Sequence, residues 1–246
     1  MARAGIGDRV EGFHAVRAAV LAGRAATVRI EQRRLTRDAY RELAESARAR
    51  GARVEVVDDV RDGAFTSAPQ GVVASCRPKP TVSLETAVAA TDPAALLVLD
   101  HLDDQRNLGA AVRSAAAAGL KAVVVPGRRS APVGAAAFKA AAGTLEEVSL
   151  VEVSSIPEAL RRIERLGIWR VGLDAGAEHS LFGFDLLTDP VAIVVGAEGT
   201  GLHHLTAERC DALVRIPHAG PVESLNASVA TALAVFEVSR ARGWVS

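Results

Sequence analysis

The chain has 246 residues, of which 49% are hydrophobic and 4% aromatic, and its 29 Lys and Arg balance 29 Asp and Glu. This length suits one large or two small globular domains. The two cysteines, Cys76 and Cys210, lie far apart and form no CxxC pair, which excludes a disulfide framework and a cysteine-based zinc site. No apolar run reaches the roughly 18 residues that span a bilayer, and the first ten residues lack an apolar signal core. We therefore expect a cytoplasmic protein with no membrane partner.

The balanced total hides an uneven distribution of charge. Residues 1–80 contain 15 Lys and Arg against 10 Asp and Glu, whereas residues 81–246 contain 14 against 19. A basic N-terminal third can act as an electrostatic contact for a polyanion. The alternative, that these arginines only solvate helix faces, is equally open at this point.

Residues 1–76 are predicted to form a small α/β module, with residues 1–10 frayed. The apolar patterns predict strands at Thr27–Ile30, Arg53–Val57 and Gly71–Ser75, and helices from Glu11 to Gly23, at Arg37–Arg50 and at Val60–Phe65. The segment Arg77-Pro78-Lys79-Pro80 then breaks the pattern, because alternate prolines favour an extended backbone and remove hydrogen-bond donors. We expect a linker at residues 77–90.

Residues 91–246 are predicted to form a second domain in which strands alternate with helices. The expected strands are Leu96–Leu99, Ala122–Val125, Val148–Val151, Arg170–Leu173, Val191–Val195 and Leu213–Ile216. The expected helices are Leu108–Ala118, Gly134–Ala142, Ile156–Leu166, Thr206–Cys210 and a final helix that begins at Asn226 or Ser228, either of which can cap it. Uniformly apolar strands joined by helices predict an α/β fold with a parallel sheet covered on both faces.

Three of these strands run into polar loops. The first loop is followed by Asn107 and Arg113, the second contains Glu198, and the third contains Ser224 and Asn226. In open α/β sheets, ligands bind outside the carboxyl ends of the strands. The three loops are therefore expected to form a single site.

The sequence lacks the motifs of several common enzyme classes. The loop after Leu96–Asp100 does not match the dinucleotide pattern G-x-G-x-x-G, and neither a P-loop lysine nor a G-x-S-x-G elbow is present. The histidines at 101, 179, 203, 204 and 218 form no H-x-x-x-H pair, so each is interpreted as a surface or capping residue.

The three loops together resemble the motifs of a known family. They read Asn107-x-Gly109-x3-Arg113, Gly196-Ala-Glu198-Gly199-x-Gly201-Leu202 and Ile216-Pro217-x3-Pro221-Val222-x-Ser224-Leu225-Asn226-x-Ser228. In order and spacing they are similar to the three motifs of SPOUT-class, TrmH-like RNA 2′-O-ribose methyltransferases, over residues 95–240. Glu11-Gly12-x-His14-Ala15-Val16 and Gln70-Gly71-Val72 resemble the substrate-binding domain of the large-subunit rRNA guanosine 2′-O-methyltransferases in this branch.

The resemblance implies a fold and a cofactor. The C-terminal segment would thread a deep trefoil knot, an exception to the rule against knotted chains. S-adenosyl-L-methionine would bind in the knot, held largely by main chain, and no metal would be needed. The matching cofactor-binding positions are Gly196, Ala197, Glu198, Ile216, Val222 and Leu225. The family acts as a homodimer with the site near the subunit interface.

The resemblance also assigns roles to side chains. Arg113 would activate the ribose hydroxyl as a base or, because guanidinium stays protonated, would bind phosphate and stabilise alkoxide charge. Asn107 would orient Arg113 or the ribose, and Glu198 would hold Arg113 or Asn226. Ser224 and Asn226 would contact substrate and shape the cofactor loop.

The implied substrate is RNA rather than DNA, because the 2′-hydroxyl is the reacting group. Arginines of the first domain would add phosphate contacts that position the RNA without reading its sequence: Arg29, Arg33, Arg34, Arg37 and Arg41. The favoured function is methylation of a ribosomal RNA guanosine, in 23S rRNA. Two alternatives stay open, a transfer RNA 2′-O-methyltransferase and an inactive RNA-binding protein with the same fold.

Overall fold

The computed structural model describes residues 6–128, 130–221 and 224–244. The chain divides into two compact units. The N-terminal unit comprises residues 1–80 and 132–147, and the C-terminal unit comprises residues 81–131 and 148–246. Within the described parts, no helix is long and apolar enough to cross a membrane.

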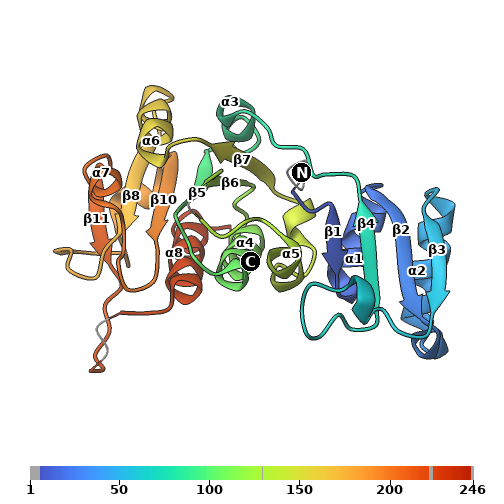
Figure 1. The fold of residues 1–246 in the computed structure, drawn as a ribbon. Coiled ribbons are helices and arrows are strands. Elements are labelled where there is room, and N and C mark those ends of the chain that lie inside the picture. Colours follow the sequence, from blue (N-terminus) through green and yellow to red (C-terminus); the bar gives the residue numbers. More distant parts are fainter. Residues whose placement is uncertain (1–5, 129, 222–223, 245–246) are drawn as a thin grey trace. The chain divides into compact units, whose positions relative to one another are not determined.

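The N-terminal unit is built on a four-stranded mixed sheet of order β1-β4-β2-β3 (Figure 1). Strand β4 pairs antiparallel with both β1 and β2, while β2 and β3 are parallel. In chain order the elements are β1 Arg9–Glu11, α1 Phe13–Leu21, β2 Ala25–Glu31, η1 Gln32–Thr36, α2 Asp38–Ala49, β3 Arg53–Val57, η2 Arg61–Gly63, β4 Val72–Cys76, α5 Ala135–Ala140 and η3 Thr144–Glu146.

A segment from much later in the chain completes this unit. Phe138 of α5 is fully buried, and the guanidinium of Arg24 lies 5.5 Å from the centre of its ring. Arg24 Nε also donates a 2.9 Å hydrogen bond to Glu146 Oε2, and both side chains are almost fully buried. A buried charge is tolerated when it is paired and hydrogen-bonded, so this pair ties residues 132–147 to the N-terminal unit. The expected division at residues 76 and 91 did not include this insertion.

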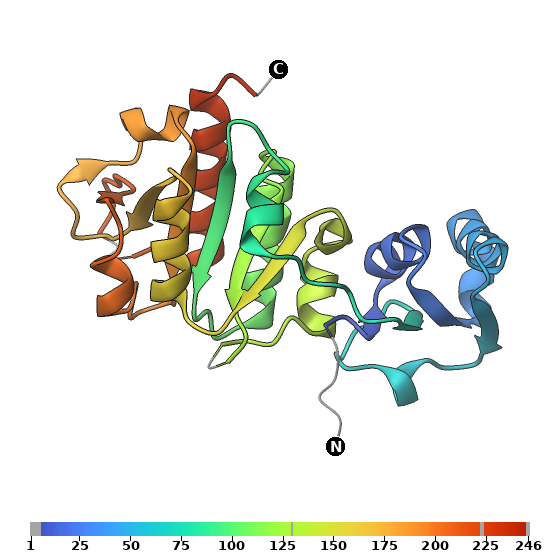
Figure 2. The same ribbon diagram turned by 90° about the horizontal axis from the view of Figure 1, so that it is seen from above.

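The C-terminal unit contains a seven-stranded sheet of order β7-β6-β5-β10-β8-β11-β9, in which every recorded pairing is parallel. Figure 2 shows β5, β6 and β7 side by side in this order. The elements in chain order are α3 Leu84–Val88, β5 Ala95–Asp100, α4 Gln105–Ala117, β6 Ala122–Pro126, β7 Ser149–Val153, α6 Ile156–Arg165, β8 Trp169–Leu173, β9 His179–Ser180, η4 Asp185–Thr188, β10 Val191–Gly196, α7 His204–Ala207, β11 Ala212–Arg215 and α8 Ala227–Ala241. The predicted α/β class with a parallel sheet is confirmed.

Helices cover both faces of this sheet. Helices α4 and α8 pack against each other on one face, and α3 and α6 cover the other (Figure 1). Successive residues of a strand point to opposite faces, so a central strand between two helical layers must be apolar at every position. Strands β5 and β10 meet this requirement, because all six residues of each are buried.

Short polar side chains set where several helices begin. Asp104 accepts a 2.7 Å hydrogen bond from the backbone N–H of Arg106 at the start of α4. Ser155 caps α6. Asn226 caps α8 by accepting hydrogen bonds from the N–H groups of Ser228 and Val229. Each cap satisfies backbone donors that have no partner within the helix. Of the two caps expected for the final helix, the structure selects Asn226.

Several local expectations differ from the structure. The helix expected at Val60–Phe65 is only the short 3-10 turn η2, Arg61–Gly63. Residues 9–11 form strand β1 by pairing with β4, although this stretch was expected to be largely frayed. The segment expected as a linker contains helix α3, because Ser83 accepts a hydrogen bond from the N–H of Thr86 and Leu84 packs in the core. Residue Glu11 ends β1 instead of starting α1.

Candidate active site

The carboxyl ends of β8, β10 and β11 border a pocket in the C-terminal unit. Its volume is 390 Å³, within the range of roughly 300–1,000 Å³ usual for small-molecule sites. Apolar side chains from the strand ends and the following loops form much of the wall, among them Leu173, Val195, Val214, Ile216 and Leu225. The sheet therefore places a small-molecule site at the edge that the strand–loop pattern predicted.

The loop after β10 folds back on itself at the wall of this pocket. Ala197 and Gly201 exchange two backbone hydrogen bonds of 3.1 and 3.0 Å, closing a tight hairpin. A Cβ atom on Gly196 would lie 2.1 Å from the carbonyl carbon and oxygen of Gly201. Because these are backbone atoms, no side chain can be accommodated at Gly196 without moving the loop. Gly196, Ala197 and Glu198 all line the pocket.

Three side chains from distant segments meet beside this hairpin. Asn107 Nδ2 donates a 2.6 Å hydrogen bond to Glu198 Oε1, and Asn226 Nδ2 donates one of 3.2 Å to Asn107 Oδ1. Asn226 Nδ2 also donates to Glu198 Oε1. The three residues come from α4, the β10 loop and the cap of α8, so the network joins all three sequence motifs.

The remaining predicted cofactor positions are Ile216, Val222 and Leu225. Ile216 and Leu225 line the pocket together with the hairpin, as does Ser224, which was predicted to contact the substrate. Val222 lies outside the described residues. Within the described chain, the predicted cofactor positions thus surround one cavity.

Arg113 is not part of this cluster. It is exposed on α4 and forms no hydrogen bond or ion pair with any described residue. It follows Asn107 by six residues, which separates the two by about 9 Å along the helix axis and about 120° around it. The buried face of α4 carries Leu108, Ala111 and Val112 instead. No described residue occupies this guanidinium, which suits a group that meets another molecule.

The five arginines expected to bind RNA lie on the N-terminal unit, and most have an acidic neighbour. Arg33 Nε donates a 2.6 Å hydrogen bond to the buried carboxylate of Glu31, which lies 3.8 Å from Arg34 Nε. Arg29 and Arg41 pair with Glu55 and Asp38. Arg37 has no acidic partner among the described residues, and its guanidinium lies 5.8 Å from the Tyr40 ring centre.

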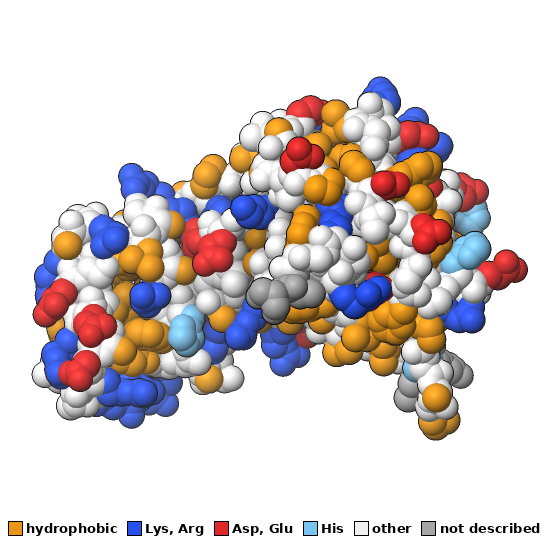
Figure 3. All heavy atoms as spheres, turned by 180° about the vertical axis from the view of Figure 1, so that it is seen from behind, with side chains coloured by type: hydrophobic (Ala, Val, Ile, Leu, Met, Phe, Trp, Pro, Cys, Tyr) orange, Lys and Arg blue, Asp and Glu red, His pale blue; other side chains and the backbone are white. Residues whose placement is uncertain are grey.

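Positively and negatively charged side chains lie together on the surface of the N-terminal unit. Basic and acidic side chains alternate on the face of the N-terminal unit in Figure 3. The excess of arginine in the sequence therefore overstates the free positive charge, because carboxylates neutralise part of it.

The pocket also contains residues that the motif analysis missed. Asp174 follows β8 and lines the pocket, as do Thr200 and His218. Asp174 ends the apolar strand segment Arg170–Leu173, so the strand-end rule that selected Glu198 could also have found it. A second missed group joins Asp100 and His101, at the end of β5, to His203, which precedes α7 and is more than 100 residues away in the sequence.

An ion pair between Arg170 of β8 and Asp211, which precedes β11, links these two neighbouring strands. Burial would raise the pKa of the Asp211 carboxyl, but hydrogen bonds from the side chain and backbone of Arg170 outweigh burial and lower it. Cys210 lies next to this pair, and burial raises the pKa of its thiol to about 12. Cys210 therefore stays a neutral thiol at physiological pH and is no candidate nucleophile.

The comparison with family models covers both units. Residues 94–236 match the SpoU rRNA Methylase family. The chain belongs to the SpoU rRNA methylase family. Residues 9–82 match a second model, RNA 2′-O ribose methyltransferase substrate binding. The resemblance inferred from the three motifs is confirmed.

Curated relatives in this family are similar over much of their length. A 23S rRNA (guanosine-2′-O-)-methyltransferase RlmB from Escherichia coli K12 is 42% identical over 191 residues, which are 76% of this chain and 77% of that protein. The protein of the same name from Yersinia pestis is 49% identical over 148 residues, 60% of each chain.

Solved structures share the fold of this SpoU-family chain. The SpoU methyltransferase AviRb from Streptomyces viridochromogenes, in complex with the cofactor AdoMet, is 26% identical with a TM-score of 0.80. That alignment covers 96% of this chain and 90% of AviRb. An RNA 2′-O ribose methyltransferase is 29% identical with a TM-score of 0.79, over 95% and 88% of the two chains.

The hairpin contact at Gly196 yields the first prediction. Gly196→Ala is expected to weaken binding of S-adenosylmethionine more than about tenfold, equivalent to about 1.4 kcal/mol, because the new methyl group must displace the pocket wall. Isothermal titration calorimetry measures this affinity. Gly220→Ala is the matched control, since a Cβ on Gly220 meets no atom of the described residues within 4 Å. Equal affinities of the two variants would contradict the role given to the hairpin.

Proposed function

We propose that this SpoU-family chain is an S-adenosylmethionine-dependent methyltransferase that modifies the 2′-hydroxyl of a guanosine in 23S rRNA. The observation that carries the proposal is the meeting of Asn107, Glu198 and Asn226 beside the pocket lined by Gly196 and Leu225. The names of the curated relatives support the substrate, and the AdoMet complex of AviRb supports the cofactor.

The pocket fits such a cofactor. At Gly196 the β10 strand end and the loop lie too close for any side chain, so the wall there is backbone, which can hydrogen-bond an adenine or a ribose. Ile216 and Leu225 supply apolar contacts on other sides. When bound, S-adenosylmethionine would supply an activated methyl group on sulfur.

The side chains beside the pocket can position the acceptor. Methyl transfer needs the ribose oxygen in line with the bond that breaks, so positioning carries much of the rate. Asn107 and Glu198 hold each other by the 2.6 Å hydrogen bond, which fixes both at the mouth of the pocket. Asn226 shares this network while capping α8, so its amide is held from two sides.

Arg113 is proposed to act on the RNA rather than on the cofactor. A guanidinium stays protonated near neutral pH, so its natural role is to hold a phosphate and stabilise negative charge on the ribose oxygen. Its exposure and its lack of a partner among the described residues suit a group that awaits RNA or a second subunit.

Replacing Arg113 with Ala is expected to slow 2′-O-methylation by more than about 100-fold, as removal of one charge-stabilising donor does. The affinity for S-adenosylmethionine should stay within about threefold, since Arg113 lies outside the pocket lining. Arg106→Ala is the control, because Arg106 is an exposed arginine of the same helix that pairs with Asp104.

The assay maps ribose methylation on 23S rRNA and on transfer RNA separately, with the wild-type chain and each variant. Methylation of 23S rRNA at undiminished rate by Arg113→Ala would refute its role. Modification of transfer RNA alone would overturn the proposed substrate, and no methylation of either RNA by the wild type would favour the inactive RNA-binding protein.

The N-terminal unit is proposed to bind RNA phosphates through its exposed arginines. Arg37 and Arg41 are the best probes, because substituting Arg33 or Arg34 would also remove one of the two cationic partners of the buried Glu31. The match of residues 9–82 to a substrate-binding model supports this assignment.

The double substitution Arg37→Gln and Arg41→Gln is expected to weaken rRNA binding and to flatten the dependence of log K on log salt by about 0.7–0.9 for each lost phosphate contact. Filter binding from low to high salt measures both effects. The control is Arg161→Gln with Arg165→Gln, which removes the same charge from α6 of the other unit. Identical slopes for the two double variants would show that Arg37 and Arg41 do not contact RNA.

The C-terminal segment is proposed to thread a knot, as in related folds. Strand β11 is separated from β10 by β8, yet α8 packs against α4 and β10. Ile216 and Leu225, the described residues on either side of this connection, both line the pocket with the hairpin after β10, so the chain returns from β11 across the end of β8. This path supports the knotted topology that the family resemblance implies.

A homodimer is also proposed, with α8 in the interface. Val229, Leu233 and Phe236 lie on one face of α8 and are 47%, 37% and 43% exposed, while Ala234, Val235 and Val238 of the other face are buried. An apolar stripe on one helix is typical of a protein–protein contact.

An enzyme that acts on ribosomal RNA would work in the cytoplasm.

Phe236→Glu is expected to convert the dimer to monomer at micromolar concentration, because it places a charge in the apolar contact. Sedimentation velocity measures the mass. Leu205→Glu is the control, since Leu205 is also exposed but lies on α7. A dimer that persists in Phe236→Glu would exclude this face.

A further inference from the structure

Asp100 is a buried carboxylate without a basic partner of fixed charge. It ends the central strand β5 and is 0% exposed. Among the described residues its ion-pair partners are two histidines, His101 and His203, and no lysine or arginine. Buried carboxylates are normally paired with a cation or coordinate a metal, so Asp100 is incompletely compensated whenever both rings are neutral.

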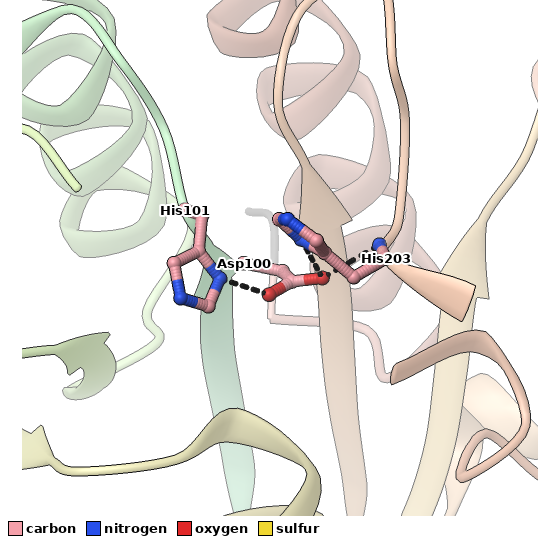
Figure 4. A group of neighbouring side chains, drawn as sticks. All are labelled: Asp100, His101 and His203. Atoms are coloured by element: carbon pink, nitrogen blue, oxygen red, sulfur yellow. Dashed lines mark hydrogen bonds and ion pairs between the residues drawn. The ribbon is translucent and has the colours of Figure 1, made fainter. Parts of the chain in front are cut away.

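Both oxygens of this carboxylate are engaged by imidazole rings (Figure 4). His101 Nδ1 lies 2.6 Å from Asp100 Oδ1, and His203 Nδ1 lies 3.2 Å from Oδ2. The ring centres of the two histidines are 4.6 Å apart. The backbone N–H of His203 also donates a 2.9 Å hydrogen bond to Oδ2, which fixes the position of that residue.

The backbone at His101 is held in an unfavourable conformation. Its φ angle is +60°, in the left-handed region that few residues other than glycine adopt. Such backbone strain concentrates at functional sites. Here it turns the His101 ring onto Asp100, as Figure 4 shows.

We propose that Asp100, His101 and His203 form a binding site for one divalent transition-metal ion of the zinc and cobalt type. One ligand atom from each residue lies within 4.8 Å of the others. Two imidazole nitrogens and one carboxylate oxygen are a ligand set that this class of metal accepts. Nothing in the family match or in the proposed methyl transfer calls for this site.

The geometry suits a three-ligand site with an open position. Bonds of about 2.0–2.2 Å in a tetrahedral site place the donor atoms about 3.3–3.6 Å apart, so small ring rotations suffice here. The side chain of His101 is 23% exposed and that of His203 is 58% exposed, so an ion can enter from solvent and keep a water ligand. The buried Asp100 supplies the negative charge.

A bound ion would tie two parts of the active-site region together. His203 follows the hairpin that lines the pocket, and Asp100 lies opposite Gly196 in the pairing of β5 with β10. The alternative is a metal-free trio in which the hydrogen bonds alone anchor the loop.

The test is a titration of the full-length, untagged, chelator-treated protein with Co²⁺, followed by visible absorption. We expect one saturable equivalent with the absorption bands of a four-coordinate site, and displacement of Co²⁺ by Zn²⁺. His101→Gln and His203→Gln should each weaken binding by more than about tenfold, the loss produced even by outer-shell partners.

Two further variants separate metal binding from folding. His204→Gln is the matched control, because His204 is the neighbouring exposed histidine and pairs with Glu208 instead. His101→Gly should stay folded, since glycine adopts positive φ freely and the N–H of His203 still bonds Asp100, yet should lose the cobalt bands. Thermal unfolding without metal checks its fold.

Each result of these titrations either supports or overturns the proposed metal site. Loss of binding in the three substitutions at positions 101 and 203 but not in His204→Gln establishes the site. Absence of one-to-one Co²⁺ binding below millimolar concentration overturns the proposal in favour of the metal-free trio. Unchanged binding in the His101 and His203 variants, or loss in His204→Gln, places the metal elsewhere and equally overturns it.

Discussion

The active-site region depends on one close approach between two stretches of backbone. The hairpin of residues 197–201 folds back onto Gly196 at the end of β10, at a distance that leaves no space for a side chain. This contact turns the chain across the end of the strand, so that main chain forms part of the pocket wall. It also places Glu198 where Asn107 and Asn226 can reach it. The pocket wall and the polar network at the end of β10 thus both depend on residue 196 having no side chain.

The features that the sequence could predict are those governed by local rules. Strands β5 and β10 are apolar throughout because both of their faces are covered, and that pattern is legible without a structure. The convergence of Asn107, Glu198 and Asn226 follows from the parallel sheet, which collects strand ends at one edge. The burial of Phe138 and Glu146 in the N-terminal unit could not be predicted in this way. Their partner, Arg24, is more than 100 residues distant in the sequence.

Composition and periodicity describe surfaces less well than they describe cores. The arginine excess of residues 1–80 predicted a basic surface, but Glu31, Asp38 and Glu55 neutralise part of it at short range. The apolar residues Val229, Leu233 and Phe236 share one face of α8 at helical spacing, yet that face is exposed in the single chain. Apolar residues at helical spacing indicate that one face of a helix is covered, but they do not say whether the same chain or a second molecule covers it. The same limit applies to Asp100 and His203, which only the fold brings together.

The insertion of residues 132–147 into the N-terminal unit has a consequence for biosynthesis. The ribosome completes residues 1–80 early, but the partner of Arg24 and the ring beside Gly7 emerge only with α5 and η3. Until then the nascent first unit carries a desolvated guanidinium with no counter-charge, which opposes its closure. More than half of the polypeptide must therefore leave the exit tunnel before the part that is made first can reach its final form.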